Sequence, residues 1–305
     1  MPEAREVDTT EYEFKDGPSD PPKSPRRPVE VEFAAISDPG RVRTNNEDHY
    51  LITRMSRTYR PLRTNMPAGE LPDPFDDVAY GMVVADGMGG MSAGEKASQL
   101  AIRTGVELVL NSPRWATRID EEEARHLIGR MCEYFRKVDN AVIGQARAHR
   151  GLRGMGTTLT LAYSVGIDVF IVHVGDSRAY LHRAGGLSQL TRDHTVAQNL
   201  ADVGAIKPEE VHRHNTRHVL TNFVGGPTHG VDPEIATLQV RDGDTLLLCS
   251  DGLTEMVEDS DIAAILDKAP TPDDAARSLI DRALANGGRD NVTVVLARYT
   301  IPPAG

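Results

Sequence analysis

Carboxylate residues stand beside glycine or asparagine in five short segments that are far apart along the chain. The segments are Arg43-Thr44-Asn45-Asn46-Glu47-Asp48, Asp86-Gly87-Met88-Gly89-Gly90, Gly175-Asp176-Ser177-Arg178, Ser250-Asp251-Gly252 and Gly287-Gly288-Arg289-Asp290-Asn291. Carboxylate oxygens are the ligands that hard divalent cations such as Mg²⁺ and Mn²⁺ prefer, and small neighbours let the backbone approach an ion closely. Together, the segments indicate metal-dependent hydrolysis of a phosphoryl group.

Each segment is a weak signal by itself. Asp-Gly is a common turn dipeptide, so Asp86-Gly87 alone is more simply interpreted as a turn. However, Asp86 and Asp251 each follow an apolar run typical of a strand, and Asp290 directly precedes another such run. Because strand ends in stacked sheets can converge on one rim, we expect these three aspartates to meet there.

Hydrophobic periodicity predicts the elements that must position these residues. We expect strands near Val29–Ala35, Tyr50–Met55, Tyr80–Ala85, Thr157–Tyr163, Val169–Val174, Ala179–Arg183, Thr245–Cys249 and Val292–Arg298. We expect helices near 93–110, 121–149, 195–204, 259–268 and 272–285, the first capped by Ser92 and Glu95 and the last by Thr271. Between the strands, Arg57–Asp77 is expected to be a long surface loop and Gly175–Arg178 a hairpin-sized connection. This order favours an α+β arrangement of antiparallel sheets covered by helices.

Composition limits the classes of function. The chain has 305 residues, and Lys+Arg 34 against Asp+Glu 45 give a net charge of −11, which argues against a nucleic-acid or anionic-membrane binder. Two cysteines, Cys132 and Cys249, fit buried free thiols in a reducing compartment rather than a disulfide framework. No apolar run approaches the ~20 residues of a membrane span and no signal-peptide core is present, so we expect a cytoplasmic protein.

The chain divides into three parts. Residues 1–28 are rich in proline and charge, so we expect a disordered arm that cannot bury enough apolar surface to offset its ordering entropy. Residues 29–300 are expected to form a single catalytic domain, and residues 301–305 a short tail.

A specific resemblance follows from the full set of motifs. The set consists of Arg43-x-x-Asn46-Glu47-Asp48, Asp86-Gly87-Met88-Gly89-Gly90, Gly156-Thr157-Thr158, Gly175-Asp176-Ser177-Arg178, Ser250-Asp251-Gly252 and Gly288-x-Asp290-Asn291. In this order the motifs resemble those of the type-2C, metal-dependent (PPM) serine/threonine phosphatases, and the bacterial branch is the nearer match. The resemblance extends over about residues 31–299. It implies a four-layer αββα sandwich, with two antiparallel β-sheets between helical layers.

The resemblance also implies a role for individual residues in binding Mg²⁺ or Mn²⁺. Asp86 matches an aspartate that bridges two ions, and Gly87 matches a glycine whose carbonyl binds the first of them. Asp251 and Asp290 match aspartates that bind the second ion. Asp176 matches a ligand that shares a third, weaker site with the aspartate matching Asp251.

Other matching residues act around the ions rather than on them directly. Glu47 and Asp48 match acidic residues that hold metal-bound waters, and Arg43 matches an arginine that grips the substrate phosphate. Some members have a histidine, proposed as general acid, at the position of Met88. Methionine cannot donate a proton, so we assign no protein general acid and expect metal-bound water to take that part.

The implied reaction is hydrolysis of phosphoserine and phosphothreonine by in-line attack of a metal-bridging hydroxide, without a phosphoenzyme. Two divalent ions ~3.5–4 Å apart can deprotonate a shared water and stabilise such an attack. The implied partners are phosphorylated proteins, targets of a serine/threonine kinase, and we expect a monomer that binds neither nucleic acid nor membrane.

The alternative from another class is a non-catalytic phosphatase-like domain that binds a phosphoprotein or regulates a kinase. Such domains usually lose a metal aspartate, and none is missing here. The charge disfavours a two-metal nuclease, and no Cys-x5-Arg motif supports a cysteine phosphatase.

One segment leaves two interpretations open. His214 and His218 are four residues apart and could share a helix face as metal ligands, but Asn215-Thr216 is a poor helix centre and we expect no acidic or cysteine partner near them. A solvated basic stretch is the simpler interpretation. The resemblance makes Thr195–Pro227 the mobile flap beside the active site.

Overall fold

The computed structural model describes residues 29–67, 69–89, 93–112, 121–226 and 230–302. The predicted arm 1–28, the predicted cap at Ser92 and residues 303–305 of the predicted tail lie outside these ranges.

Within the described residues the strands form two sheets, and every strand pairing is antiparallel. The five-stranded sheet has the order β1 (Glu30–Asp38), β11 (Val292–Thr300), β10 (Thr245–Cys249), β7 (Arg178–Arg183) and β8 (Gly186–Gln189). The six-stranded sheet has the order β2 (Asp48–Tyr59), β3 (Phe75–Met88), β5 (Leu159–Val165), β6 (Asp168–Val174) and β9 (Glu234–Gln239), with β4 (Gly156–Thr157) paired to the end of β3.

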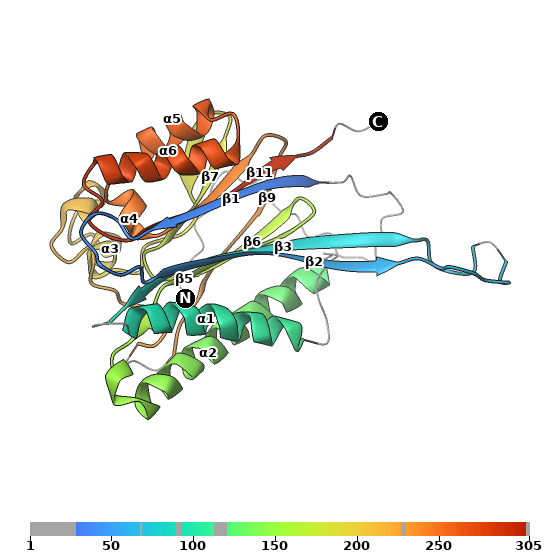
Figure 1. Cartoon of the computed structure of the whole chain (residues 1–305), viewed down its shortest axis with the longest axis horizontal. Coiled ribbons are helices and arrows are strands. Elements are labelled where there is room, and N and C mark those ends of the chain that lie inside the picture. Colours follow the sequence, from blue (N-terminus) through green and yellow to red (C-terminus); the bar gives the residue numbers. More distant parts are fainter. Residues whose placement is uncertain (1–28, 68, 90–92, 113–120, 227–229, 303–305) are drawn as a thin grey trace.

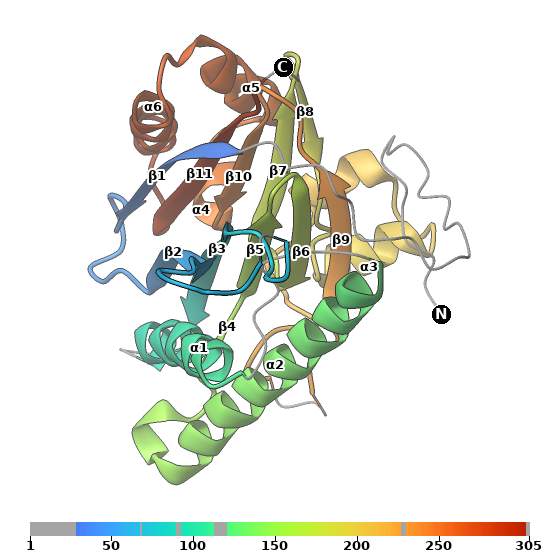
Figure 2. The ribbon, with the colours of Figure 1, turned by 90° about the vertical axis from the view of Figure 1, so that its right-hand side faces the viewer.

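Helices cover the outer face of each sheet. In Figure 1, α1 (Ala93–Leu110) and α2 (Glu121–Ala148) lie below the six-stranded sheet, and α5 (Asp259–Lys268) and α6 (Pro272–Ala285) lie above the five-stranded sheet. Two short helices, α3 (Val196–Asp202) and α4 (Asp251–Thr254), lie at the end of the sandwich opposite the long β2–β3 hairpin. Short 3₁₀ helices cover Arg150–Leu152 and Pro208–Arg213. The predicted αββα sandwich is therefore confirmed, and Figure 2 shows its layers from the side.

The core has three layers because successive strand residues point to opposite faces of a sheet. In β10, Leu246 and Leu248 pack between the two sheets, whereas Leu247 and Cys249 pack under α5 and α6. A third apolar layer, which includes Phe135, joins α1 and α2 to the six-stranded sheet. A strand buried on both faces is apolar throughout, which is why β10 was readable from its sequence.

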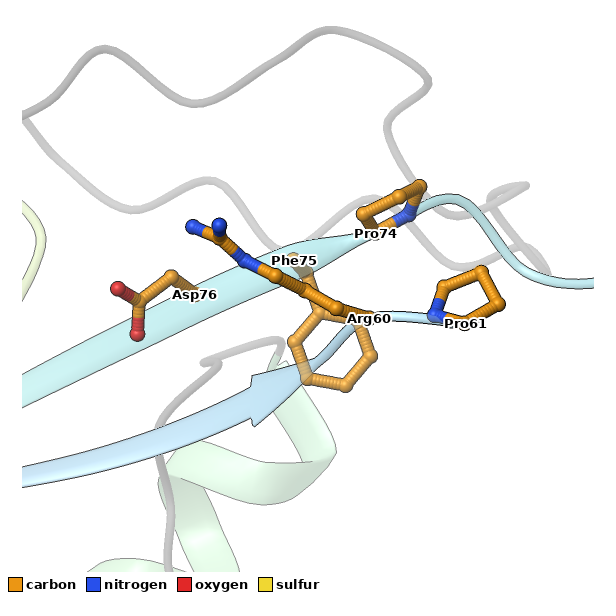
Figure 3. Close-up of a pocket in the computed structure, with 5 residues that line it drawn as sticks. All are labelled: Arg60, Pro61, Pro74, Phe75 and Asp76. Carbon is orange, nitrogen blue, oxygen red and sulfur yellow. The ribbon is translucent and has the colours of Figure 1, made fainter. Parts of the chain in front are cut away.

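The predicted loop Arg57–Asp77 is wrong at both ends. Strands β2 and β3 continue pairing as far as Tyr59 opposite Phe75, whose rings stack with centroids 5.7 Å apart. The side chain of Arg57 lies over the Phe75 ring, and cross-strand contacts of this kind stabilise a ladder without an alternating apolar pattern. A pocket lined by Arg60, Pro61, Pro74, Phe75 and Asp76 lies where the β2–β3 ladder ends, at the opposite end of the ladder from Asp48 and Asp86 (Figure 3).

The predicted hairpin about Gly175–Arg178 is also wrong. Strand β6 pairs with β5 and β9 in one sheet, whereas β7 pairs with β10 and β8 in the other. The segment therefore crosses between the sheets, and the positive φ of Gly175, 115°, is one that other residues rarely adopt. Among the helices that the structure describes, none combines the length and apolar character that a membrane crossing requires.

Candidate metal centre

The acidic residues singled out from the sequence converge at the end of the sandwich that lies away from the hairpin tip. Asp48 opens β2 and faces Asp86 of β3 directly across the ladder. Asp176 lies in the crossing after β6, Asp251 begins α4 just after β10, and Asp290 lies just before β11. Burial raises the pKa of Asp86 well above its ordinary range, and the charges of the other four aspartates raise it further. The three aspartates expected to meet at one rim do so.

Asp48 links the two sheets through hydrogen bonds. Its Oδ2 accepts hydrogen bonds from the hydroxyls of Ser250 and Thr293, each at 2.7 Å. Both hydroxyls belong to the other sheet, Ser250 just after β10 and Thr293 in β11. The side chain is buried, and its Oδ1 has no hydrogen-bond partner among the described residues. Burial raises the pKa of Asp48 to about 6. A buried carboxylate oxygen without a partner is costly unless a cation or water satisfies it.

The backbone around Asp86 is held in place by the Gly156-Thr157-Thr158 motif. The amide of Asp86 donates to Thr158 Oγ1 at 2.9 Å, and its carbonyl accepts from the Thr158 amide at 2.9 Å and the Thr157 hydroxyl at 2.8 Å. At Gly87, a Cβ atom would lie 2.2 Å from the carbonyl oxygen of Gly94. The motif was visible in the sequence, but its role as the support of Asp86 was not.

Asn291 anchors the loop that carries Arg43 and Glu47. Its side-chain oxygen accepts from the Glu47 amide at 2.8 Å, and its side-chain nitrogen donates to the carbonyl of Asn45 at 2.8 Å. Arg43 then reaches back to Asp290, with 2.6 Å between Nη2 and Oδ2. The Arg43 side chain is 55% exposed, so its guanidinium remains accessible to a ligand.

Asp176 and Asp251 occupy the flank of the centre that faces the 195–226 segment. Burial raises the pKa of Asp176 to about 7, with a further contribution from Asp193. Burial also raises the pKa of Asp251, and the next largest contributions come from Asp176 and Glu255. Burial is the largest cause of both shifts, and the neighbouring carboxylates add to it.

The donor set fits hard divalent cations. Every candidate ligand is a carboxylate or a backbone carbonyl, and one buried oxygen of the nearby Asp48 lacks a partner among the described residues. Like charges that raise one another's pKa are stabilised by a cation placed among them. This is the chemistry expected of a Mg²⁺ or Mn²⁺ centre.

Gly252 is tightly packed against the backbone beside the centre, whereas Gly105 has open space around it, so substitutions at the two positions test how closely α4 packs against β11. At Gly252 a Cβ atom would lie 2.0 Å from the carbonyl oxygen of Asn291, a backbone atom. We expect Gly252→Ala to lower the free energy of unfolding by about 3 kcal/mol, because overpacking must move α4 or the start of β11. In helix α1, Gly105 has nothing within 4 Å of the added Cβ, so Gly105→Ala should stabilise by about 0.5–1 kcal/mol. Urea unfolding of both variants measures the difference, and equal stabilities would contradict the close contact.

The histidine-rich segment does not form the shared helix face, which is the less favoured interpretation of its sequence. The 3₁₀ helix ends at Arg213, and His214 follows it in extended backbone and contacts Thr216 through its Nδ1. His218 lies 2.9 Å from Glu255, measured from Nδ1 to Oε1. His218 is exposed, as expected of a solvated stretch, but the expectation of no acidic partner is wrong, because Glu255 is distant in sequence and adjacent in space.

The family model for protein phosphatase 2C matches residues 75–286. The chain belongs to the protein phosphatase 2C family. Within it, the chain falls in the bacterial branch of metal-dependent (PPM) phosphatases, as its sequence motifs predicted.

Two bacterial relatives illustrate the extent of the similarity. The serine/threonine protein phosphatase PstP of Mycobacterium tuberculosis is 39% identical over 268 residues, which are 88% of this chain and 45% of PstP. The chain thus spans less than half the length of that relative. The serine/threonine phosphatase stp of Listeria monocytogenes is 32% identical over 269 residues, which are 88% of this chain and 96% of that protein.

Solved structures of the family share the fold. The crystal structure of PstP/Ppp from Mycobacterium tuberculosis aligns with a TM-score of 0.69 at 38% identity, covering 88% of this chain and 98% of that one. The PstP catalytic domain in complex with two manganese ions aligns with a TM-score of 0.68 at 36% identity, covering 90% of this chain and all of that one. In a relative, the same sandwich fold therefore holds a pair of manganese ions.

Proposed function

We propose that this protein is a metal-dependent protein serine/threonine phosphatase. The observation that carries the proposal is the convergence of Asp48, Asp86, Asp176, Asp251 and Asp290 at one end of a phosphatase 2C sandwich. Its substrates would be phosphorylated proteins, the targets of a serine/threonine kinase, and the enzyme would act as a monomer in the cytoplasm. Its relatives, which are named serine/threonine phosphatases, support this activity, and the complete aspartate set argues against the non-catalytic alternative.

We assign the ligands of two Mg²⁺ or Mn²⁺ ions to this chain as follows. Asp86 and the carbonyl of Gly87 would hold the first ion, and Asp86, Asp251 and Asp290 would hold the second. Glu47 and Asp48 would accept hydrogen bonds from the water around the ions. When bound, the ion pair supplies Lewis acidity toward the phosphoryl group and favours the deprotonated form of the attacking water.

The protein's own groups orient the substrate and the ligands. Arg43 presents a planar fork of donors to the phosphate, and Asp290 and the loop anchored by Asn291 fix where that fork lies. The Ser250 and Thr293 hydroxyls hold Oδ2 of Asp48, which leaves its Oδ1 free to face the centre. Met88, at the end of β3, has no proton to give, so the proton for the leaving alkoxide comes from water.

Replacement of Arg43 tests the phosphate contact. Charge-assisted hydrogen bonds contribute about 1.5–3 kcal/mol, so Arg43→Ala should raise KM for p-nitrophenyl phosphate roughly 10–100-fold. Arg41→Ala is the matched control, because Arg41 is exposed on the same loop. Its backbone amide donates to the Gly288 carbonyl, and the substitution leaves that hydrogen bond in place. Steady-state kinetics of both variants in Mn²⁺ decides the matter. An unchanged KM for Arg43→Ala would count against the assignment.

We also propose a third, weaker ion held by Asp176 together with Asp251. Asp176→Ala should lower the turnover of phosphopeptides while the two ions at Asp86 stay bound. Crystals of the variant grown in Mn²⁺ check this through anomalous scattering. Loss of the Asp86 ions in those crystals would refute the separation of the third site from the pair.

The decisive assay compares substrates and metals. Phosphothreonine, phosphoserine and phosphotyrosine peptides are incubated with the protein in Mn²⁺, in Mg²⁺ and in EDTA, and the released phosphate is measured. Hydrolysis of the first two peptides in metal, and its loss in EDTA, is the expected result. Tight binding of the phosphopeptides without hydrolysis in either metal would instead favour the non-catalytic domain.

A further inference from the structure

His218 and Glu255 meet at the boundary between the 195–226 segment and the centre. Glu255 follows the last residue of α4, and its amide donates to the carbonyl of Asp251 at 2.9 Å. Residues four apart in a helical turn lie on one side of it, so Asp251 and Glu255 face the same way. His218 approaches from the opposite segment, 2.9 Å from Glu255.

The three side chains can converge on one point. One ring nitrogen of His218 and one carboxylate oxygen each from Asp251 and Glu255 all lie within 4.8 Å of one another. In the described part of the chain, no hydrogen bond or ion pair engages the Asp251 carboxylate. Arg217 is the nearby cation, with its Nε 3.6 Å from Glu255, and it contacts Glu255 rather than Asp251.

We propose that His218, Asp251 and Glu255 form a binding site for a divalent cation that accepts imidazole, with Zn²⁺ as the representative ion. Zinc binds both imidazole nitrogen and carboxylate oxygen, whereas Mg²⁺ prefers oxygen ligands alone. Three protein ligands also leave a position open to water. The proposal rests on the proposed function only in that Asp251 is shared with the paired ions.

A bound ion would have a mechanical consequence. His218 is the only one of the three ligands that lies in the 195–226 segment, whereas Asp251 begins α4 and Glu255 directly follows it, next to the centre. The ion would replace the direct contact between His218 and Glu255 by coordination from both sides. It would therefore hold this segment against the centre, and zinc would act on substrate access without reacting itself.

A zinc titration with matched variants tests the site. The full chain is held in saturating Mg²⁺, which occupies the oxygen-only sites, and titrated with ZnCl₂ in a calorimeter. We expect His218→Gln to weaken one zinc site by about ten-fold or more, since loss of a ligand should cost at least as much as loss of an outer-shell partner. His212→Gln is the control, because His212 is exposed on the same segment and is not part of the cluster. Asp176→Ala should also retain the site.

Two further measurements place the ion and its effect. Zinc-edge anomalous diffraction should give a peak among the three side chains in the unaltered protein and no peak there in His218→Gln. Hydrogen exchange of residues 214–222 should slow on zinc addition in the unaltered protein only. Zinc found solely beside Asp86, or equal affinity in His218→Gln and the unaltered protein, would overturn the proposal and leave an ordinary ion pair. Because these readouts need no turnover, a failed phosphatase assay would not affect them.

Discussion

The Asp86→Asn variant is expected to lose at least about 10³-fold in turnover of p-nitrophenyl phosphate at saturating Mn²⁺. Asp86 is the one residue proposed to contact both ions, and each 1.36 kcal/mol of lost transition-state stabilisation lowers the rate about ten-fold. Loss of one bridging carboxylate from a two-ion site is expected to cost several kcal/mol. Asn has nearly the same shape, so the backbone bonds to Thr157 and Thr158 should persist.

The same substitution should not destabilise the metal-free fold. Burial and the neighbouring aspartates make an ionised Asp86 unfavourable without metal, and Asn removes that charge. The melting temperature in EDTA should therefore equal or exceed that of the unaltered protein. Asp281→Asn, on the exposed face of α6, controls for general loss of negative charge. If the turnover of Asp86→Asn were near that of the control, the proposed role of Asp86 in the metal centre would be wrong.

The metal-free protein should lose stability as the pH rises through about 4 to 7. An unfolded aspartate has a pKa near ~3.9, whereas the folded pKa is about 6 for Asp48 and about 7 for Asp176. The folded state thus holds protons that the unfolded state releases. The resulting stabilisation is fully present below the unfolded pKa and is lost as the pH passes the folded values.

Divalent cations should reverse this trend. They bind the ionised carboxylates, so the stabilisation that Mn²⁺ gives should grow from pH 5 to pH 8. Thermal unfolding in EDTA and in Mn²⁺, each at pH 5 and at pH 8, measures the four melting temperatures that are compared. Asp48→Asn should flatten the pH dependence in EDTA, because it removes one of the buried groups. If the EDTA-treated protein became more stable toward pH 8, the raised pKa values of the buried carboxylates would be contradicted.

Periodicity in the sequence predicted most of the sandwich. Helices α1, α2, α5 and α6 fall within a residue or two of their predicted bounds, because their apolar stripes face a sheet. Strands β8 and β9 and the outer ends of β2 and β3 went unpredicted. Strand β8 and the two outer ends are largely polar, and cross-strand pairing rather than an apolar pattern holds them in the sheet.

The sequence by itself determined the chemistry available to this protein: which carboxylates stand at strand ends, and which family their order matches. Only the tertiary structure decided that Asp48 is bound by Ser250 and Thr293, that the Asp176 segment crosses between sheets, and that His218 meets Glu255. The physical reason is the range of the interactions. Helix and strand formation depends on neighbours a few residues away, whereas the bond from Ser250 to Asp48 joins residues 202 positions apart. No local pattern records which distant partner a polar side chain will find when the two sheets pack together.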